Sequence, residues 1–258
     1  MNKTLCSLLM LALLASCGTT YSIQGTSDVS TLDGRMLYLK VYKDNDFTAV
    51  DSCDVVHGQF RFNGGIDSAQ MATLFMDENS LMPVVLESGE ISITINNTQT
   101  SVSGTPLNEK LFEFMDSYNQ LESQLYELPH KQSQAIMNGE DEATINAALN
   151  AEAAKILKDE EDLVTTFISE NFDNVLGPGV FFMMTAGSRY PMLQPWIDHL
   201  WTIATDNFKN DSYVKDFYEK ARQNEAIMNG LAEPGDPLPQ VDNPPSYGVN
   251  TPATDTNP

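Results

Sequence analysis

Two hydrophobic periods divide the chain into a strand-forming part and a helix-forming part. From residue 21 to about residue 104, short stretches rich in β-branched and aromatic residues are separated by turn signals such as Asp33-Gly34. Such stretches predict strands. The seven predicted strands span residues 21–25, 35–43, 47–55, 58–64, 71–77, 81–89 and 90–96. Because no helical period interrupts them, they predict a small antiparallel sandwich or barrel.

Two of these stretches alternate strictly between apolar and polar residues. Phe60 and Phe62 alternate with polar residues in one, and Ile91, Ile93 and Ile95 do so in the other. Since successive side chains of a strand point to opposite faces, each of these strands is expected to bury one face.

From Pro106 onward the apolar residues recur at steps of three and four, which is the period of a helix. Two long helices are expected, and Pro129 is expected to break or kink the first of them. Their apolar stripes are Leu107, Leu111, Phe114, Tyr118, Leu121, Leu125 and Leu128, and then Ile145, Leu149, Ala153, Ile156, Leu163 and Phe167, with Glu160 as the one polar gap. A short turn-like stretch joins the two helices, which predicts an antiparallel helical hairpin.

Shorter helices are expected over residues 177–186, 191–208 and 211–230. The last of these begins at an Asp211/Ser212 cap and ends at Gly230. Beyond residue 231 the chain is rich in proline and almost without large apolar side chains. Such a composition predicts a disordered tail, because it buries too little surface to offset its ordering entropy.

The first residues have the layout of a secretory signal. Lys3 is followed by an apolar core over residues 8–14 and then by two small residues. The core is too short to span a bilayer. The last four residues, Leu14-Ala15-Ser16-Cys17, resemble the bacterial lipobox, in which the cysteine is joined to lipid. We therefore expect Cys17 to anchor the protein in a membrane; the alternative is an ordinary signal whose cleavage leaves a free thiol.

These features predict an α+β chain in four segments. They are a signal peptide over 1–16, a β-rich domain over 17–104, a helical region over 105–230 and a tail over 231–258.

Charge excludes one class of partner. The chain carries 14 basic and 36 acidic side chains and a net charge of −22. Nucleic acids are not expected to bind, because contact with phosphate depends on lysine and arginine. The acidic excess favours a solvated exterior, with attraction of a basic protein or a cation as the alternative.

The cysteine count limits redox chemistry. Cys6 leaves with the signal and Cys17 is assigned to lipid, so Cys53 is alone in the mature chain and has no intramolecular partner. Asp51 and Asp54 are expected to raise the pKa of its thiol rather than activate it. Cys53 is interpreted either as a thiol for a mixed disulfide with a partner or as an ordinary strand residue.

No other residues form a catalytic or metal-binding motif, so we expect neither an enzyme nor a cofactor. His57, His130 and His199 are scattered, and the acidic turns lack the ligand spacing of a calcium loop. Ser68, within Asp67-Ser68-Ala69, matches the short pattern of bacterial O-glycosylation sites. The aromatic groups at residues 181–184 and 196–201 form either a hydrophobic groove or part of the core.

Five short motifs carry a family resemblance. They are Leu32-Asp33-Gly34, Asp51-Ser52, Gly58-Gln59-Phe60, Glu87-Ser88-Gly89 and Ser103-Gly104-Thr105-Pro106. Their order resembles the domain of unknown function 4369, which is found in exported lipoproteins of Bacteroidota. In many members this domain precedes a thioredoxin-like domain. The stretch over 232–242 is similar to the usual linker, but no Trp-Cys-x-x-Cys follows, so the resemblance implies no reductase activity for any residue here.

The sequence therefore favours a non-catalytic lipoprotein that binds a protein or peptide partner at the periplasmic side of the outer membrane. The alternative is an accessory role in envelope thiol or peroxide metabolism, with a separate thioredoxin-like protein. Carbohydrate or lipid binding by the sandwich would rest on fold analogy alone.

Overall fold

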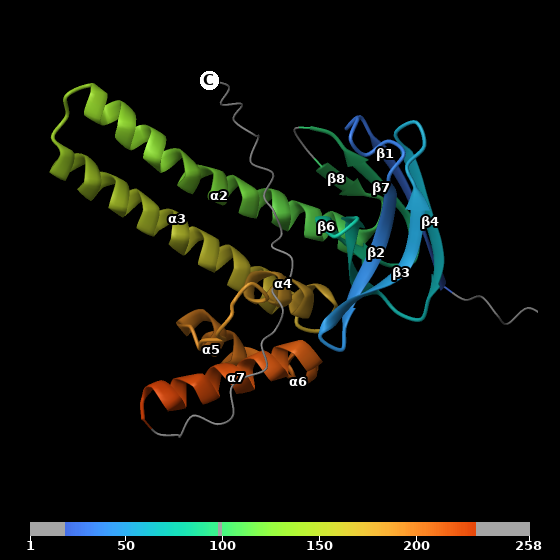
Figure 1. The fold of residues 1–258 in the computed structure, drawn as a ribbon. Coiled ribbons are helices and arrows are strands. Elements are labelled where there is room, and N and C mark those ends of the chain that lie inside the picture. Colours follow the sequence, from blue (N-terminus) through green and yellow to red (C-terminus); the bar gives the residue numbers. More distant parts are fainter. Residues whose placement is uncertain (1–18, 98–99, 231–258) are drawn as a thin grey trace, which may run out of the picture. The chain divides into compact units, whose positions relative to one another are not determined.

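The computed structural model describes residues 19–97 and 100–230 (Figure 1). Strands come first and helices follow, so the predicted α+β class is confirmed. The described chain forms two compact units. The β-rich unit holds residues up to 77 and from 83 to 109, and the helical unit holds 78–82 and 110–230. Cys17, the predicted signal peptide and the predicted tail lie outside the described residues.

Two four-stranded sheets make up the strand part of the chain. The strands are β1 (Thr19–Ser27), β2 (Met36–Lys43), β3 (Asp46–Asp54), β4 (Gln59–Ile66), β5 (Gln70–Met76), β6 (Asn79–Leu86), β7 (Gly89–Ile95) and β8 (Thr100–Ser103). One sheet has the order β4-β1-β7-β8 and the other has the order β3-β2-β5-β6. The sheets do not close into a barrel, so the sandwich is the correct one of the two predicted architectures.

The strand prediction was incomplete in two respects. β8 was missed because its four residues include a single large apolar side chain, Val102, which is buried. The sheets are also not purely antiparallel, because β1 pairs with β7 in parallel while it pairs with β4 antiparallel. Strands that are distant in sequence meet here, and the direction of such a pairing does not show in local periodicity.

The alternating strands bury the predicted faces. Phe60 and Phe62 are buried in β4, while the polar residues between and beside them are exposed. Ile91, Ile93 and Ile95 are buried in β7 in the same way. The predicted register of both strands is therefore confirmed.

The helices begin with a long hairpin. The helical elements are α2 (Pro106–Met137), α3 (Glu142–Glu170), α4 (Leu176–Thr185), α5 (Pro195–Ile203), α6 (Asp206–Asn210) and α7 (Ser212–Met228). Phe114 of α2 lies against Phe167 of α3 with ring centroids 4.4 Å apart, and Lys131 Nζ lies 2.5 Å from Glu152 Oε1. Because the partner number falls as the α2 number rises, the helices run antiparallel, as predicted.

Pro129 does not break α2, which continues eight residues beyond it to Met137. The segment after the proline is held to α3 by the Lys131–Glu152 ion pair and by a 2.7 Å hydrogen bond from Gln132 to Asn146. These contacts explain why the loss of one backbone hydrogen bond at the proline leaves the helix intact.

The shorter helices follow the predicted order with one division. The stretch predicted as one helix over 191–208 is split into α5 and α6, because Ala204 adopts an extended backbone conformation. Asp211 caps α7 as predicted, since its side chain accepts hydrogen bonds of 3.1 Å from the backbone N–H groups of Tyr213 and Val214. Gly230 follows the helix end with φ at +68°.

Candidate functional site

Cys53 is half-buried in β3 and is the free cysteine of the described residues. Burial raises the pKa of the thiol to about 11, and the charges of Asp51 and Asp54 add to the shift. Tyr21 donates a 3.3 Å hydrogen bond to Asp51, and burial together with this carboxylate raises the pKa of the phenol to about 12. Cys53 is therefore mostly protonated at neutral pH, which weighs against a role as an attacking thiolate.

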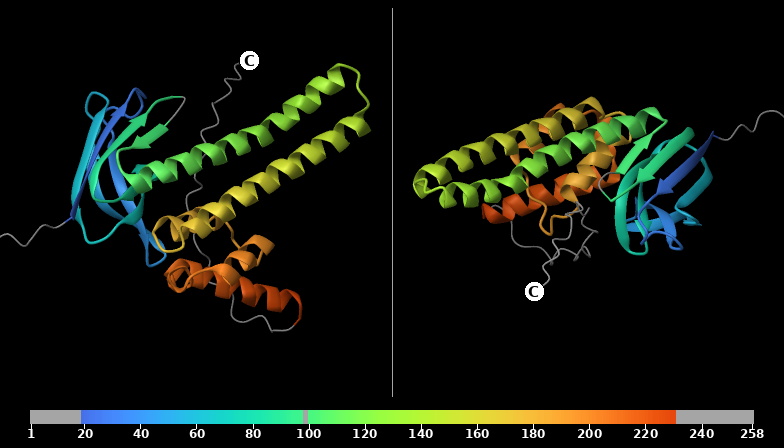
Figure 2. Two further views of the ribbon diagram at one scale, coloured as in Figure 1. Left: turned by 180° about the vertical axis from the view of Figure 1, so that it is seen from behind. Right: turned by 90° about the horizontal axis from the view of Figure 1, so that it is seen from above.

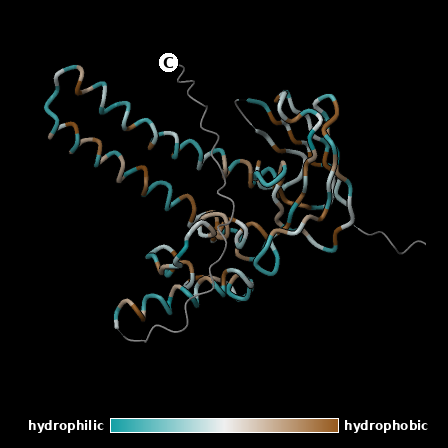
Figure 3. Tube along the Cα trace, in the orientation of Figure 1, coloured by the Kyte–Doolittle hydropathy of each residue, from teal (hydrophilic) through white to brown (hydrophobic). Residues whose placement is uncertain are grey.

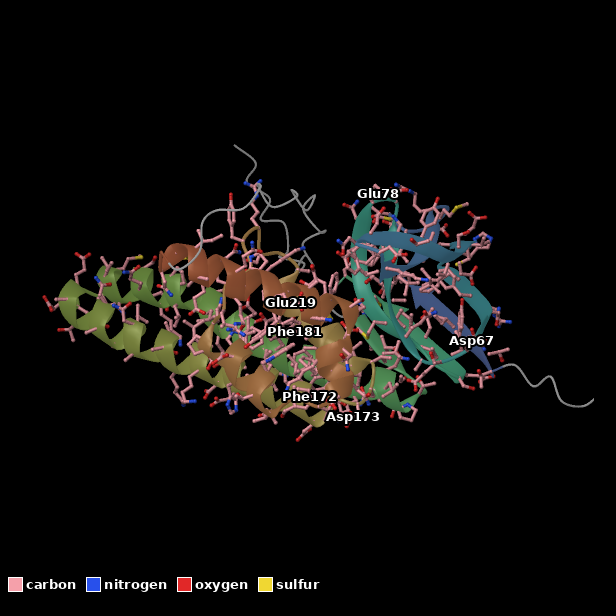
Figure 4. The ribbon with its side chains drawn as sticks, turned by 90° about the horizontal axis from the view of Figure 1, so that it is seen from below. Asp67, Glu78, Phe172, Asp173, Phe181 and Glu219 are labelled. Atoms are coloured by element: carbon pink, nitrogen blue, oxygen red, sulfur yellow. The ribbon has the colours of Figure 1, made fainter. Side chains whose placement is uncertain are left out.

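The other predicted positions in the β-rich unit are exposed. Ser68 lies in the turn between β4 and β5, next to Asp67, which is labelled in Figure 4. This is an accessible position for a modified hydroxyl, and the O-glycosylation of Ser68 stays a prediction.

The histidines do not assemble into a site. His57 has a positive φ of 52° in the turn before β4, His130 lies within α2 and His199 within α5, and all three are exposed. Among residues 19–97 and 100–230, no group of three or more histidine, cysteine or carboxylate side chains is placed to hold a metal ion.

The first aromatic group is core. Phe181 is 1 % exposed, and its ring lies 5.4–6.3 Å from the rings of Trp196, Phe208, Tyr213 and Phe217. Figure 4 shows Phe181 within the helical unit. Of the two interpretations left open by the sequence, burial therefore holds for this group. The rings around it belong to α5, α6 and α7, and α4 itself also packs against α3 of the long hairpin.

The second aromatic group, at residues 196–201, is also covered by neighbouring side chains. Trp201 stacks on Tyr218 with ring centroids 3.8 Å apart and an angle of 7°. Lys209 Nζ lies 5.7 Å from the centroid of the Trp201 ring. Ile197 and Leu200, between the two tryptophans, are buried. A ring whose faces are covered in this way has little free surface on which a ligand could stack.

A buried polar network joins the strands to the start of α2. The side-chain amide of Asn108 donates to the Val85 carbonyl at 2.7 Å, and its oxygen accepts from the Val85 N–H at 2.8 Å. Glu87 Oε1 accepts from the N–H groups of Leu107 and Asn108 at 2.9 and 3.0 Å, so it caps the helix. Thr105 Oγ1 accepts from Asn108 at 2.9 Å.

This network explains two of the motifs behind the family resemblance. Glu87 and Thr105 come from separate motifs and meet around Asn108. Gly104 has φ at +101°, and a Cβ there would collide with the backbone oxygen of Glu90. The motifs are therefore structural: they end β8 and start α2.

A second polar cluster lies between α2 and α3. Tyr118 and Glu122 of α2 both lie beside the Glu160 carboxylate of α3 and interact with it. Burial and the Glu160 carboxylate raise the pKa of the Tyr118 phenol, and burial, followed by the charge of Glu160, raises the pKa of Glu122. Oε2 of Glu160 is buried without a hydrogen-bond partner. In the sequence, Glu160 is the one polar gap in the apolar stripe of residues 145–167, and this gap is the signal for the cluster.

The Glu122–Glu160 pair has a measurable consequence for pH dependence. A raised pKa in the folded state favours the protonated acid, so its contribution to stability is present below the pKa of the unfolded chain, near 4.5. It is lost as pH rises through the higher folded value. Glu122→Gln should therefore raise the free energy of unfolding at pH 7 by about 0.5 kcal/mol, since the pair is partly exposed. At pH 4 the variant should match the wild type.

Urea denaturation at both pH values measures this difference. The exposed Glu127 of the same helix supplies the control, and Glu127→Gln should change the pH 7 midpoint much less. Equal gains in the two variants would show a general relief of acidic charge and not a specific pair.

The outer part of the hairpin leaves apolar side chains open to solvent. Leu111 and Phe114 near the start of α2 are buried, but none of the described side chains from residue 115 to residue 137 is. Tyr126, Ile136 and Leu157 are each half exposed or more. Figure 3 shows hydrophobic residues recurring between hydrophilic ones along both helices. These three side chains lie outside the apolar stripes that the two helices share, which is why pairing of the helices leaves them accessible.

A comparison with known protein families gives one match for this chain. A family model described as Domain of unknown function (DUF4369) matches residues 21–111. No curated protein matches the chain. The match covers the strands of both sheets and ends just inside α2, at Leu111, so it includes the Asn108 network. Residues 21–111 of this chain are therefore similar to the DUF4369 domain.

Proposed function

We propose that the protein is a non-catalytic lipoprotein of the cell envelope that binds a protein or peptide partner. The observation that carries the proposal is the outer part of the α2–α3 hairpin, where apolar side chains such as Tyr126 and Leu157 are about half exposed. Large exposed apolar side chains grouped on one element are typical of interaction surfaces. The accessory redox role gains no support from Cys53, whose raised pKa disfavours the thiolate.

The proposed membrane anchor is inferred from the sequence alone. Leu14-Ala15-Ser16-Cys17 resembles a lipobox, and Cys17 lies outside the described residues. The residues after Cys17 lack an acidic cluster of the kind that marks surface export in Bacteroidota, which favours the periplasmic face of the outer membrane. In the described part of the chain, no helix has the length and apolar character needed to cross a membrane.

Replacement of the anchor residue tests the localisation. Cys17→Ser should abolish incorporation of labelled fatty acid and move most of the protein, on the order of nine tenths, from the membrane to the soluble fraction, because lipid chains supply the membrane affinity. Cell fractionation and fatty-acid labelling measure both effects. Cys53→Ser is the matched control and should leave labelling unchanged. Continued labelling of Cys17→Ser would overturn the proposed anchor.

Partner binding has its own test. Chemical cross-linking in intact cells, followed by purification from envelope membranes, should give a reproducible higher-mass species that contains one particular partner. The Cys17→Ser variant should lose this species if the partner is held at the membrane. Recovery of the monomer alone from the wild type would contradict the proposed function.

A further inference from the structure

One side of the α2–α3 hairpin combines exposed apolar side chains with unneutralised acidic charge. We define the hairpin face by Tyr118, Glu122 and Tyr126 of α2 and by Leu157 and Glu160 of α3. The α2 residues are spaced by four, so they follow one side of that helix. Glu160 contacts both Tyr118 and Glu122, and Leu157 lies one turn before it. The five residues therefore share one side of the hairpin.

The inner end of this side is covered by other helices, and its outer end is not. Val164 and Ile168 continue the Leu157 side of α3 at steps of seven and four, and they are 6 % and 0 % exposed, because α4 and α5 pack against α3. Further out, Tyr126 is 55 % and Leu157 is 54 % exposed. Figures 1 and 2 agree that the outer end of the hairpin extends beyond α4–α7.

Tyr126 and Leu157 lie at the same level of the hairpin. The residue numbers of the Lys131–Glu152 ion pair and of the Gln132–Asn146 hydrogen bond set the antiparallel register. This register places residue 126 opposite residues 152–157. The level of Tyr126 is therefore within five residues of Leu157 along α3, so one segment that lies along the hairpin can contact both side chains.

The charge of the hairpin indicates which kind of partner segment fits the hairpin face. Residues 118–160 carry eight acidic and three basic side chains. Two of the three basic residues are already paired, Lys131 with Glu152 and Lys158 with Asp162. Beside the apolar pair, Glu122 and Glu160 face each other, and the neighbouring carboxylate contributes to the raised pKa of Glu122. A cationic side chain placed there would relieve this repulsion.

We propose that the hairpin face binds an amphipathic helix of a partner protein, with leucine-like residues against Tyr126 and Leu157 and lysine or arginine beside Glu122 and Glu160. This inference rests on the proposed function and names the partner's chemistry. A third helix would cover the apolar side chains of the hairpin face that pairing of α2 with α3 leaves exposed. A second copy of this chain fits poorly, because it would bring the same excess of acidic charge to the same face.

A defined peptide tests the proposal on the full chain, purified in detergent. The probe is a fluorescent synthetic helix of about 18 residues, with leucine every three or four positions and lysine elsewhere. Fluorescence anisotropy in near-physiological salt should show saturable binding. Tyr126→Ser/Leu157→Ser should weaken it by about tenfold, since a few apolar anchors carry most interface energy. Glu122→Gln should weaken it less and reduce its dependence on salt.

Matched controls separate a specific face from general attraction to an acidic protein. Tyr190 and Met192, in the loop before α5, are 70 % and 49 % exposed. Tyr190→Ser/Met192→Ser should leave affinity unchanged, and a probe with glutamate in place of lysine should not bind. Equal losses in both double variants, or equal binding of the acidic probe, would overturn the inference. A dimer seen in sedimentation and lost in Tyr126→Ser/Leu157→Ser would also overturn it, in favour of self-association.

The two proposals fail differently. If the cross-linked partner species forms equally well with Tyr126→Ser/Leu157→Ser, the hairpin face is wrong and the partner-binding function stands. If the wild type gives no such species, the function itself is wrong.

Discussion

Phe181→Ala should lower the free energy of unfolding of the helical unit by about 4 kcal/mol, the range expected for removal of a buried aromatic ring. Phe181 is 1 % exposed and contacts rings from three other helices, so truncation leaves a cavity that no single neighbour can fill. Part of the loss comes from ring pairs such as Phe181–Phe217, whose centroids lie 5.4 Å apart in an edge-on arrangement.

Urea denaturation followed by tryptophan fluorescence measures this loss. Both tryptophans of the chain, Trp196 and Trp201, lie in α5, so the signal reports on the helical unit. Tyr190→Ala is the control, because the Tyr190 side chain is 70 % exposed, and it should change stability by less than about 0.5 kcal/mol. A small effect of Phe181→Ala would show that the aromatic group is loosely packed, which would restore the groove interpretation.

Asn108→Ala should cost about 2–3 kcal/mol, because it leaves several buried polar groups without partners. The backbone N–H and C=O of Val85 both bond to the Asn108 side chain, and Glu87 and Thr105 bond to the same amide. Asn108 is 1 % exposed, so water cannot replace these bonds without local unfolding. The expected loss is therefore larger than that of a surface hydrogen bond.

Asn119→Ala supplies the matched control in the same helix. Asn119 is exposed, and alanine favours a helix over asparagine, so this variant should be neutral or slightly more stable. Far-UV circular dichroism in urea compares the two, and hydrogen exchange at Val85 tests the location of the damage. Similar midpoints for Asn108→Ala and the wild type would mean that the network contributes little to the fold.

The β-rich part of the fold was largely predictable because its signals are local. Alternating Phe60 and Phe62, and Ile91 to Ile95, specify which face of each strand is buried, and the structure confirms both. What local signals could not give was the strand pairing. The parallel neighbours β1 and β7 are separated by five other strands in sequence, and their contact depends on how the two sheets close over the core.

The candidate sites show the same difference between local sequence signals and tertiary contacts. The acidic neighbours of Cys53 are visible in the sequence, and they were enough to predict a raised thiol pKa; burial, which is the larger cause, is a tertiary effect. Glu160 showed only as a polar gap. Its contacts with Tyr118 and Glu122 come from a helix more than thirty residues earlier, so no local pattern contained them.

Periodicity and composition alone were enough to predict the α+β class, the two long amphipathic helices, the lipobox resemblance at Cys17 and the acidic neighbours of Cys53. Each of these depends on neighbouring residues or on simple counts. The tertiary structure decided which apolar side chains are core and which are surface. Phe181 and Leu157 both lie within helices, α4 and α3, yet one is 1 % and the other 54 % exposed. The difference arises because rings from α5, α6 and α7 enclose Phe181, whereas Leu157 lies midway along α3 on a side that is left exposed.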